Sequence, residues 1–127
     1  MPRFDRNNAD ELRTLIYNSC AHDAKVESVG YKCGEDELKI RLFNPILNVK
    51  LDLDFHDVEL AFAVKGKEHG SPDTLISLTV EDNFSYLQAQ LKDNSAYSED
   101  SLYLLLQMFS GGELHVVAKE VTAEVTM

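Results

Sequence analysis

The chain has 127 residues, of which 44% are hydrophobic and 27% are charged, a balance typical of one globular domain. Twelve basic residues stand against 22 acidic ones, which gives a formal net charge of −10. We therefore expect neither nucleic acid nor a membrane as a partner, because clustered Lys and Arg bind both. The charge favours a basic protein as the partner, because opposite fields speed association.

The cysteines and the start of the chain predict a cytoplasmic protein. Cys20 and Cys33 are too few for a disulfide scaffold; a bridge between them stays open, but two free thiols in a reducing compartment are the simpler interpretation. The charged start leads into no long apolar run, as a signal peptide would, and no stretch reaches the ~20 apolar residues of a membrane span. We expect one domain over residues 1–127, with a disordered tail at residues 1–7.

The first expected element is a short amphipathic helix. Asn8 is a suitable N-cap residue, and Glu11 occupies the position of a capping-box acid. Leu12, Leu15 and Ile16 follow at helical spacing, and the helix should end near residues 20–22.

A period-two alternation of apolar and polar residues follows, and it indicates strands with one buried and one hydrated face. The strands expected here span residues 25–33, 38–43, 49–55 and 58–64. The first needs a bulge near Ser28 to bring its valines into phase. The second should end at Asn44-Pro45, because proline removes a ladder donor. The last two are either one long bent strand or two strands that turn between sheets.

Beyond a Gly-containing loop at residues 66–73, a further strand is expected at residues 74–80. Residues 84–91 suit both a strand and a helix, and we favour a strand because the neighbouring elements are strands. A polar link spans residues 93–99. Residues 102–109 and 114–119 form the clearest hairpin, joined at Gly111-Gly112. Residues 121–125 either continue that strand past a bulge or trail off.

These elements amount to one helix and about seven strands, with connections mostly too short for helical crossovers. The expected class is α+β and mostly β, with the N-terminal helix packed on an antiparallel sheet. A sandwich and a half-closed barrel both satisfy this pattern.

Asp52, Asp54 and His56 are the sharpest candidates for chemistry. They occupy alternate positions of one expected strand, so they project from the same face, and their side chains suit a divalent metal. Same-face neighbours on a strand stand ~7 Å apart, however, and seldom converge on one ion without a bend. We therefore favour a hydrated face with cross-strand partners such as Lys39, Arg41 or Lys50, and a metal-dependent enzyme is the least favoured alternative.

The histidines and cysteines match no catalytic pattern. In His22-Asp23 and His56-Asp57 the two residues are adjacent, and adjacent strand residues face opposite ways. His115 alone carries no signal. Cys20 near a helix C-terminus and Cys33 beside acidic residues both lack the surroundings that favour a thiolate. We expect no catalytic residues and no cofactor.

The expected strand at residues 102–108 is apolar on both faces. Tyr103 and Leu105 stand opposite Leu102 and Leu104. The strand is therefore either central and covered on both sides or part of an interface. Pairing of this strand with its copy across a two-fold axis would make the chain a structural module that forms a homodimer.

From Ala21 onward, the layout resembles small uncharacterised bacterial domains that occur near toxin–antitoxin gene neighbourhoods. The segments that carry the resemblance are His22-Asp23, Glu37-Leu38-Lys39-Ile40-Arg41-Leu42, the run Leu51, Leu53, Phe55 and Val58, and Gly111 to Lys119. The resemblance implies a one-helix-plus-sheet fold. Some of these domains are thought to be immunity proteins that bind and block a toxin. It implies no catalytic residues.

The function that we expect is therefore that of a small acidic cytoplasmic binding module, of the immunity type, that inhibits a basic protein. Asp52, Asp54 and Glu59 would attract the partner electrostatically. Tyr103 and Leu105 would supply apolar contacts at the interface. A structural or oligomerisation role without catalysis is the alternative.

Overall fold

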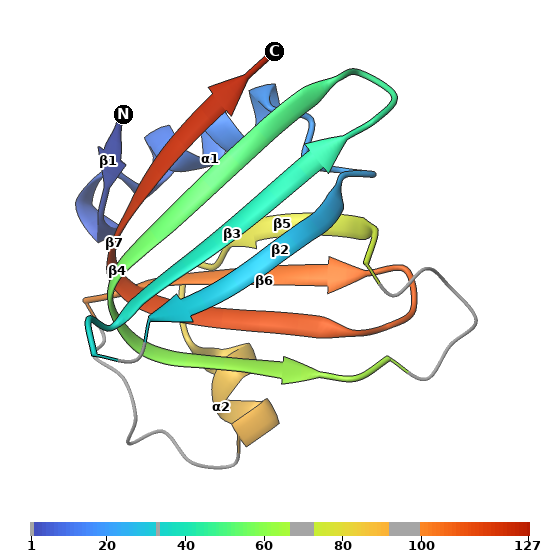
Figure 1. The fold of residues 1–127 in the computed structure, drawn as a ribbon. Coiled ribbons are helices and arrows are strands. Elements are labelled where there is room, and N and C mark those ends of the chain that lie inside the picture. Colours follow the sequence, from blue (N-terminus) through green and yellow to red (C-terminus); the bar gives the residue numbers. More distant parts are fainter. Residues whose placement is uncertain (1, 33, 67–72, 92–99) are drawn as a thin grey trace.

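The computed structural model describes residues 2–32, 34–66, 73–91 and 100–127, and the strands in these ranges form one antiparallel sheet (Figure 1). The elements in chain order are β1 (Arg3–Phe4), the 3-10 turn η1 (Arg6–Asn8), α1 (Ala9–Asn18), β2 (Lys25–Lys32), β3 (Glu37–Asn44), β4 (Val49–Val64), β5 (Leu75–Val80), α2 (Ser85–Leu91), β6 (Leu102–Met108) and β7 (Glu113–Thr126). Cys33, His69, most of the expected loop at 66–73 and the expected link at 93–99 lie outside the described residues.

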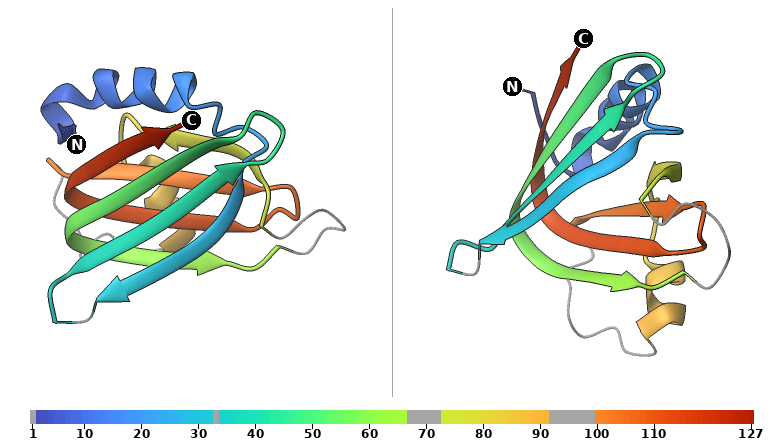
Figure 2. Two further views of the ribbon diagram at one scale, coloured as in Figure 1. Left: turned by 45° about the horizontal axis from the view of Figure 1, so that its top comes forward. Right: turned by 45° about the vertical axis from the view of Figure 1, so that its right-hand side comes forward.

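The sheet has the strand order β2-β3-β4-β7-β6-β5, and β1 pairs with the C-terminal part of β7. It is strongly curved but does not close into a barrel (Figure 2). An isolated bridge links Lys25, at the start of β2, with Thr74, just before β5, so that the two edges of the sheet touch at this point. The mostly β class with an N-terminal helix is therefore confirmed, and a sandwich of two sheets, one of the expected arrangements, is wrong.

The curvature arises where the two longest strands bend together. β4 is one continuous strand, and Asp57 near its middle has a φ of 53°. Its register against β7 shifts between Val58 and Leu60, which marks a bulge. Opposite this bulge, the alternation of buried residues along β7 shifts by one position between Ala118 and Val121. Of the expected alternatives, the long bent strand is the one observed, and β7 continues without a break.

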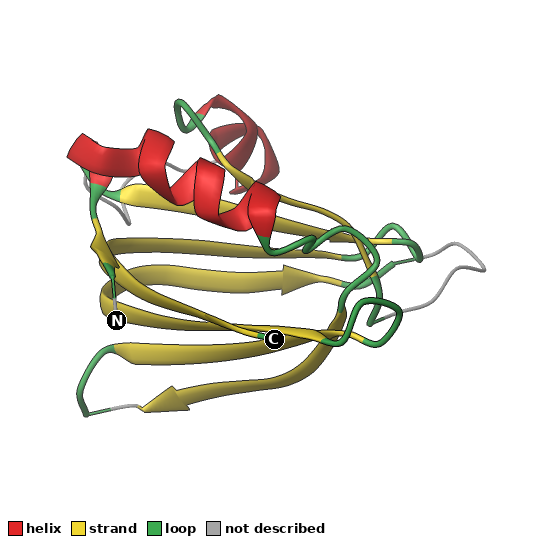
Figure 3. Cartoon of the chain, turned by 90° about the horizontal axis from the view of Figure 1, so that it is seen from above, coloured by secondary structure: helices red, strands yellow, loops and turns green. Residues whose placement is uncertain are grey.

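The main core lies on the concave side of the sheet, and α1 runs along one side of it (Figure 3). Leu12 and Ile16 of α1 are buried in this core, as their helical spacing predicts. β3 and β4 bury alternate residues against them, as expected for half-buried strands. The expected bulge in β2 is also confirmed, because its register against β3 shifts between Val26 and Ser28.

The N-terminal residues differ from the expected disordered tail. Phe4 is buried in the main core and pairs with Val121 of β7. Asp5 accepts a hydrogen bond from the Asn7 backbone N–H, and the Asn8 side chain accepts one from the Asp5 backbone N–H. The Asn8 side chain therefore caps η1 rather than α1. A single apolar residue among polar ones carries no periodicity, so the sequence pattern could not reveal this strand.

Residues 85–91 form α2 rather than the strand that we favoured. The Gln88 backbone N–H donates to the Phe84 carbonyl over 2.9 Å, and the Asn83 side chain accepts from the Ser85 N–H at the start of the helix. Helical spacing places Phe84 and Leu87 together in a second apolar cluster. The helix forms here because the outer face of the sheet is apolar at this position and needs a cover.

Candidate functional site

The expected acidic residues of β4 are paired within the sheet. Arg41 of β3 lies between Asp52 and Asp54, with its Nε 3.5 Å from Asp52 Oδ1 and its Nη1 2.8 Å from Asp54 Oδ1. The hydrogen bond that Arg41 donates to Asp54 is the main reason why the pKa of Arg41 is raised. His56 contacts Thr122 Oγ1 and Glu37 instead. Within the described ranges, no group of three His, Cys, Asp or Glu side chains is placed to hold a metal ion.

Glu59 lies apart from these two aspartates, beyond the bend in β4. It accepts a short hydrogen bond from the Ser101 hydroxyl. Lys119 forms an ion pair with Asp100 over 3.0 Å. That hydrogen bond, reinforced by the charges of Glu59 and Asp57, raises the pKa of Lys119. The three acids expected to attract a partner therefore occupy two separate environments rather than one patch.

The two residues expected to form apolar contacts with a partner are buried. Tyr103 and Leu105 lie on the outer face of β6 beneath α2, where they pack with Leu87 and Val117. β6 is thus a strand covered on both sides, which was one of the two interpretations of its apolar faces. β6 also lies between β5 and β7. The expected pairing of this strand with its copy cannot occur through an edge of β6, because both edges are already paired, and a homodimer through another surface stays a prediction.

A polar network lies within this second cluster. His115 is fully buried, with Nδ1 2.7 Å from the Tyr103 hydroxyl and Nε2 3.1 Å from Glu113 Oε1. Tyr86 of α2 donates a short hydrogen bond to the other Glu113 oxygen. Since a carboxylate only accepts, His115 carries its proton on Nε2, and Nδ1 accepts from Tyr103. Phe62 stacks on the imidazole with the ring centroids 4.4 Å apart.

Burial and hydrogen bonding set the charges of this network. Burial lowers the pKa of His115, and Glu113 only partly offsets that effect. Burial alone would raise the pKa of Glu113, but hydrogen bonds from Tyr86, His115 and Gln107 outweigh it and lower the pKa. The bond to Glu113 raises the pKa of Tyr86 to about 12. At neutral pH the network therefore holds a neutral imidazole, two neutral phenols and one carboxylate, and its burial suits a structural role.

The sequence pattern gave little indication of this network. Glu113 and His115 are two residues apart on one strand, which places them on one face. Tyr103 and Tyr86 reach them from β6 and α2, however, and only the strand register and the presence of α2 bring them there.

A second feature is an open apolar groove of about 790 Å³ between the C-terminal end of α1, the β3–β4 turn and β5, called here the α1–β5 groove. Four apolar side chains around it are exposed, by 84% for Tyr17, 77% for Ile46, 54% for Leu47 and 44% for Ile76. Contiguous apolar residues on a surface often mark an interaction site. No pattern in the sequence predicted this groove, because its residues come from three distant segments.

Asn44 fixes one wall of the α1–β5 groove. Its side-chain amide donates to the carbonyl of Cys20 over 3.0 Å, just past the end of α1. Its side-chain oxygen accepts from the backbone N–H groups of Ile46 and Leu47. One buried asparagine therefore ties the helix end to the β3–β4 turn and holds the two apolar side chains outward. Cys20, which also lines the groove, is a free cysteine.

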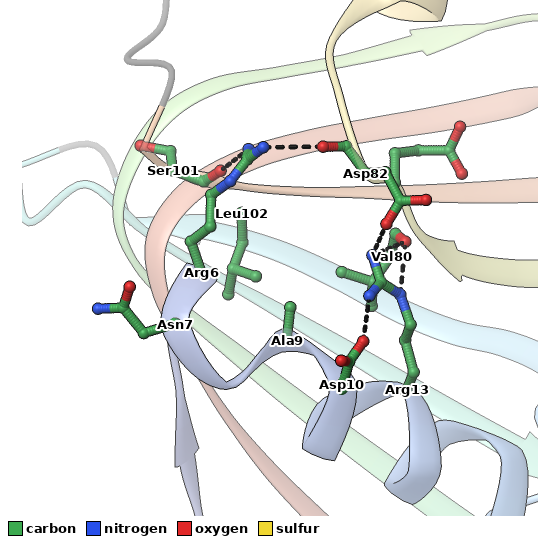
Figure 4. A pocket seen from close by; sticks show the side chains of 10 residues that line it. Arg6, Asn7, Ala9, Asp10, Arg13, Val80, Asp82, Ser101 and Leu102 are labelled. Carbon is green, nitrogen blue, oxygen red and sulfur yellow. Dashed lines mark hydrogen bonds and ion pairs between the residues drawn. The ribbon is translucent and has the colours of Figure 1, made fainter.

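A smaller pocket of about 220 Å³ lies beyond the other end of β5 (Figure 4). There Arg13 of α1 donates to the Val80 carbonyl and forms ion pairs with Asp10 and Asp82. Arg6 donates to the backbone carbonyls of Asp82 and Ser101. Both guanidinium groups already bind partners within the protein. Their contacts hold the N-terminal helices against the sheet.

The fold and these sites define a small protein with one open, curved antiparallel sheet, a buried polar network and an exposed apolar groove. No protein-family model matches the chain, and a search of curated proteins finds no match. None of the helices in the described ranges combines the length and hydropathy that a membrane crossing requires.

Proposed function

We propose that this chain is a small acidic binding module that docks a basic protein through the α1–β5 groove. The observation that carries the proposal is the exposure of Tyr17, Ile46, Leu47 and Ile76 around one groove. Large aromatic and aliphatic side chains of this kind are the usual anchors of protein interfaces. The groove is built on a helix end, a pinned turn and a strand, so it is held in shape before a partner arrives.

Charge supports a basic partner rather than a second copy of the chain. Asp23 lines the groove, and the chain as a whole carries a net charge of −10. A partner with Lys or Arg beside its apolar anchors would meet Asp23 and the negative field of the chain. Two copies of a chain with a net charge of −10 would repel each other instead.

The acids of β4 have a lesser part in this proposal. Asp52 and Asp54 already share Arg41, so they add to the long-range field rather than bind the partner directly. The resemblance to immunity-type domains would make the partner a toxin that the module blocks. A cytoplasmic location fits the free thiol of Cys20.

The proposal is tested by capturing proteins from a lysate of the native host on the immobilised chain. The groove variant carries Ile46→Ser and Ile76→Ser. The matched control carries Val29→Ser and Tyr31→Ser, which change two exposed apolar residues on β2, away from the groove. We expect a basic protein that wild type and the control retain and that the groove variant loses at least about tenfold, as for the loss of interface anchors.

The association rate of the captured protein should fall steeply as salt is raised, because the charges of the two proteins are opposite. Equal capture by all three forms, or the absence of any basic protein whose retention depends on the groove, would overturn the proposed function.

A further inference from the structure

α2 is a short cover over an apolar face of the sheet. Its seven residues span Ser85–Leu91, and Leu87 is fully buried against the outer face of β6 and β7. Phe84, just before the helix, stacks on Tyr103 with the ring centroids 5.9 Å apart. A helix of this length is not stable by itself in water, so contacts with the sheet must hold it in place.

One of those contacts leads directly to the buried histidine. Tyr86 of α2 donates to Glu113, and the opposite oxygen of that carboxylate accepts from His115. Glu113 thus links the helix to the interior of the second cluster. The groups that face His115 are Tyr103 from β6, Glu113 from β7, Tyr86 from α2, Phe62 from β4, and the more distant charge of Glu81 after β5.

These neighbours make the closed arrangement selective for a neutral imidazole. His115 Nδ1 already accepts the proton of the Tyr103 hydroxyl, so a second ring proton would displace that donor. The added charge would also be buried, with a single carboxylate to compensate it. When α2 lifts, His115 and Glu113 gain access to water and can take up protons freely. Acid therefore favours the open arrangement.

We propose that the Glu113–His115 pair is an acid-sensitive latch, which holds α2 over the outer face of β6 and β7 at neutral pH and releases it on acidification. Release would uncover Tyr103, Leu105 and Val117, which form an apolar surface that is separate from the α1–β5 groove. The latch does not depend on the proposed docking function.

The expected size of the effect follows from proton linkage. In the open form, His115 binds a proton with its ordinary pKa of 6.5, whereas burial lowers the pKa in the closed form. Between pH 7 and pH 5, the open population should therefore rise, by up to about 20-fold. A more acidic medium adds protonation of Glu113, whose lowered pKa reflects the hydrogen bonds that the closed form supplies.

The test is amide hydrogen exchange of residues 85–90 at pH 7 and pH 5, corrected for the intrinsic exchange rates. The variant is His115→Gln, which removes the titrating ring. The matched control is His56→Gln, because His56 also contacts a glutamate and a hydroxyl but lies on the half-exposed face of β4. Amides of residues 103–105 report global opening, and the His115 ring is followed by NMR in the unmodified protein.

We expect an opening of α2 that rises severalfold, by up to about 20-fold, on acidification in wild type and in the His56 control. It should change less than about twofold in His115→Gln, while residues 103–105 stay protected in all forms. Equal loss of protection in α2 and β6 would indicate global acid unfolding and overturn the latch. If His115→Gln does not fold, titration of the His115 ring near its ordinary pKa of 6.5 without a change in α2 would also overturn it.

Discussion

The molecule has two apolar surfaces outside its main core, one covered by a helix and the other exposed. The outer face around Tyr103 and Leu105 is covered by α2 and has a hydrogen-bonded network built into it. The α1–β5 groove is of comparable chemistry, yet Tyr17 and Ile46 stand exposed at its rim. Apolar character alone therefore does not identify a binding surface. What distinguishes the groove is that the described part of the chain leaves it open.

The covered surface should matter most for stability. Leu87→Ala removes a fully buried side chain from beneath α2, and we expect a loss of about 3 kcal/mol in the free energy of unfolding from lost contacts and the cavity left behind. Urea denaturation measures it. A loss no larger than that of an exposed groove residue would abolish the distinction between the two surfaces.

The covered surface should also be the one that responds to acid. The pKa of His115 is lowered in the folded state, so the unfolded chain binds the extra proton first as the pH falls below 6.5. The contribution of neutral His115 to the free energy of unfolding is therefore present above pH 6.5. It is lost on acidification, and the loss reaches up to about 2 kcal/mol at pH 5. Denaturation of wild type and His115→Gln across this range gives the difference. A smaller pH dependence in wild type than in the variant would contradict the sign.

The charged face of β4 provides an intermediate case between the two surfaces. Arg41→Met leaves Asp52 and Asp54 side by side without their shared cation, and we expect a loss of about 1 kcal/mol, because the pair is partly exposed. Added salt should shrink the difference by screening the two carboxylates. Thermal unfolding at low and high salt is the measurement, and a loss that salt leaves unchanged would point to packing of the Arg41 side chain instead.

The open groove should matter least for stability. Ile46→Ser and Leu47→Ser change exposed side chains, so each is expected to alter the free energy of unfolding by less than about 0.5 kcal/mol. The same urea titrations as for Leu87→Ala apply. A large destabilisation would mean that these residues serve the fold, and the case for a docking surface would weaken accordingly.

Local patterns predicted the strands well and the two surfaces poorly. The alternation of residues 38–43 and 49–55 fixed β3 and β4, and the phase of the valines located the bulge near Ser28. Leu87, Ala89 and Leu91 alternate as in a strand, whereas Phe84, Leu87 and Leu91 suit a helix. Only the apolar face beneath Phe84 and Leu87 decides for the helix.

The candidate site is built from residues that lie far apart in the sequence. Tyr17, Ile46 and Ile76 meet because α1, the β3–β4 turn and β5 come together in the fold. Likewise, His115 finds Tyr103 through the pairing of β6 with β7. Pairings of this range are set by sheet topology, which one sequence does not encode in any short window. Asp52 and Asp54 were visible as a pattern, but their sharing of Arg41 followed from the observed register.

Docking at the α1–β5 groove is tested most directly by an amide exchange footprint of the chain in complex with the basic protein captured on it. We expect new protection around Tyr17, Ile46 and Ile76, with no change along the outer face of β4. Protection centred on Asp52 and Asp54, with the groove residues unchanged, would contradict docking at the groove.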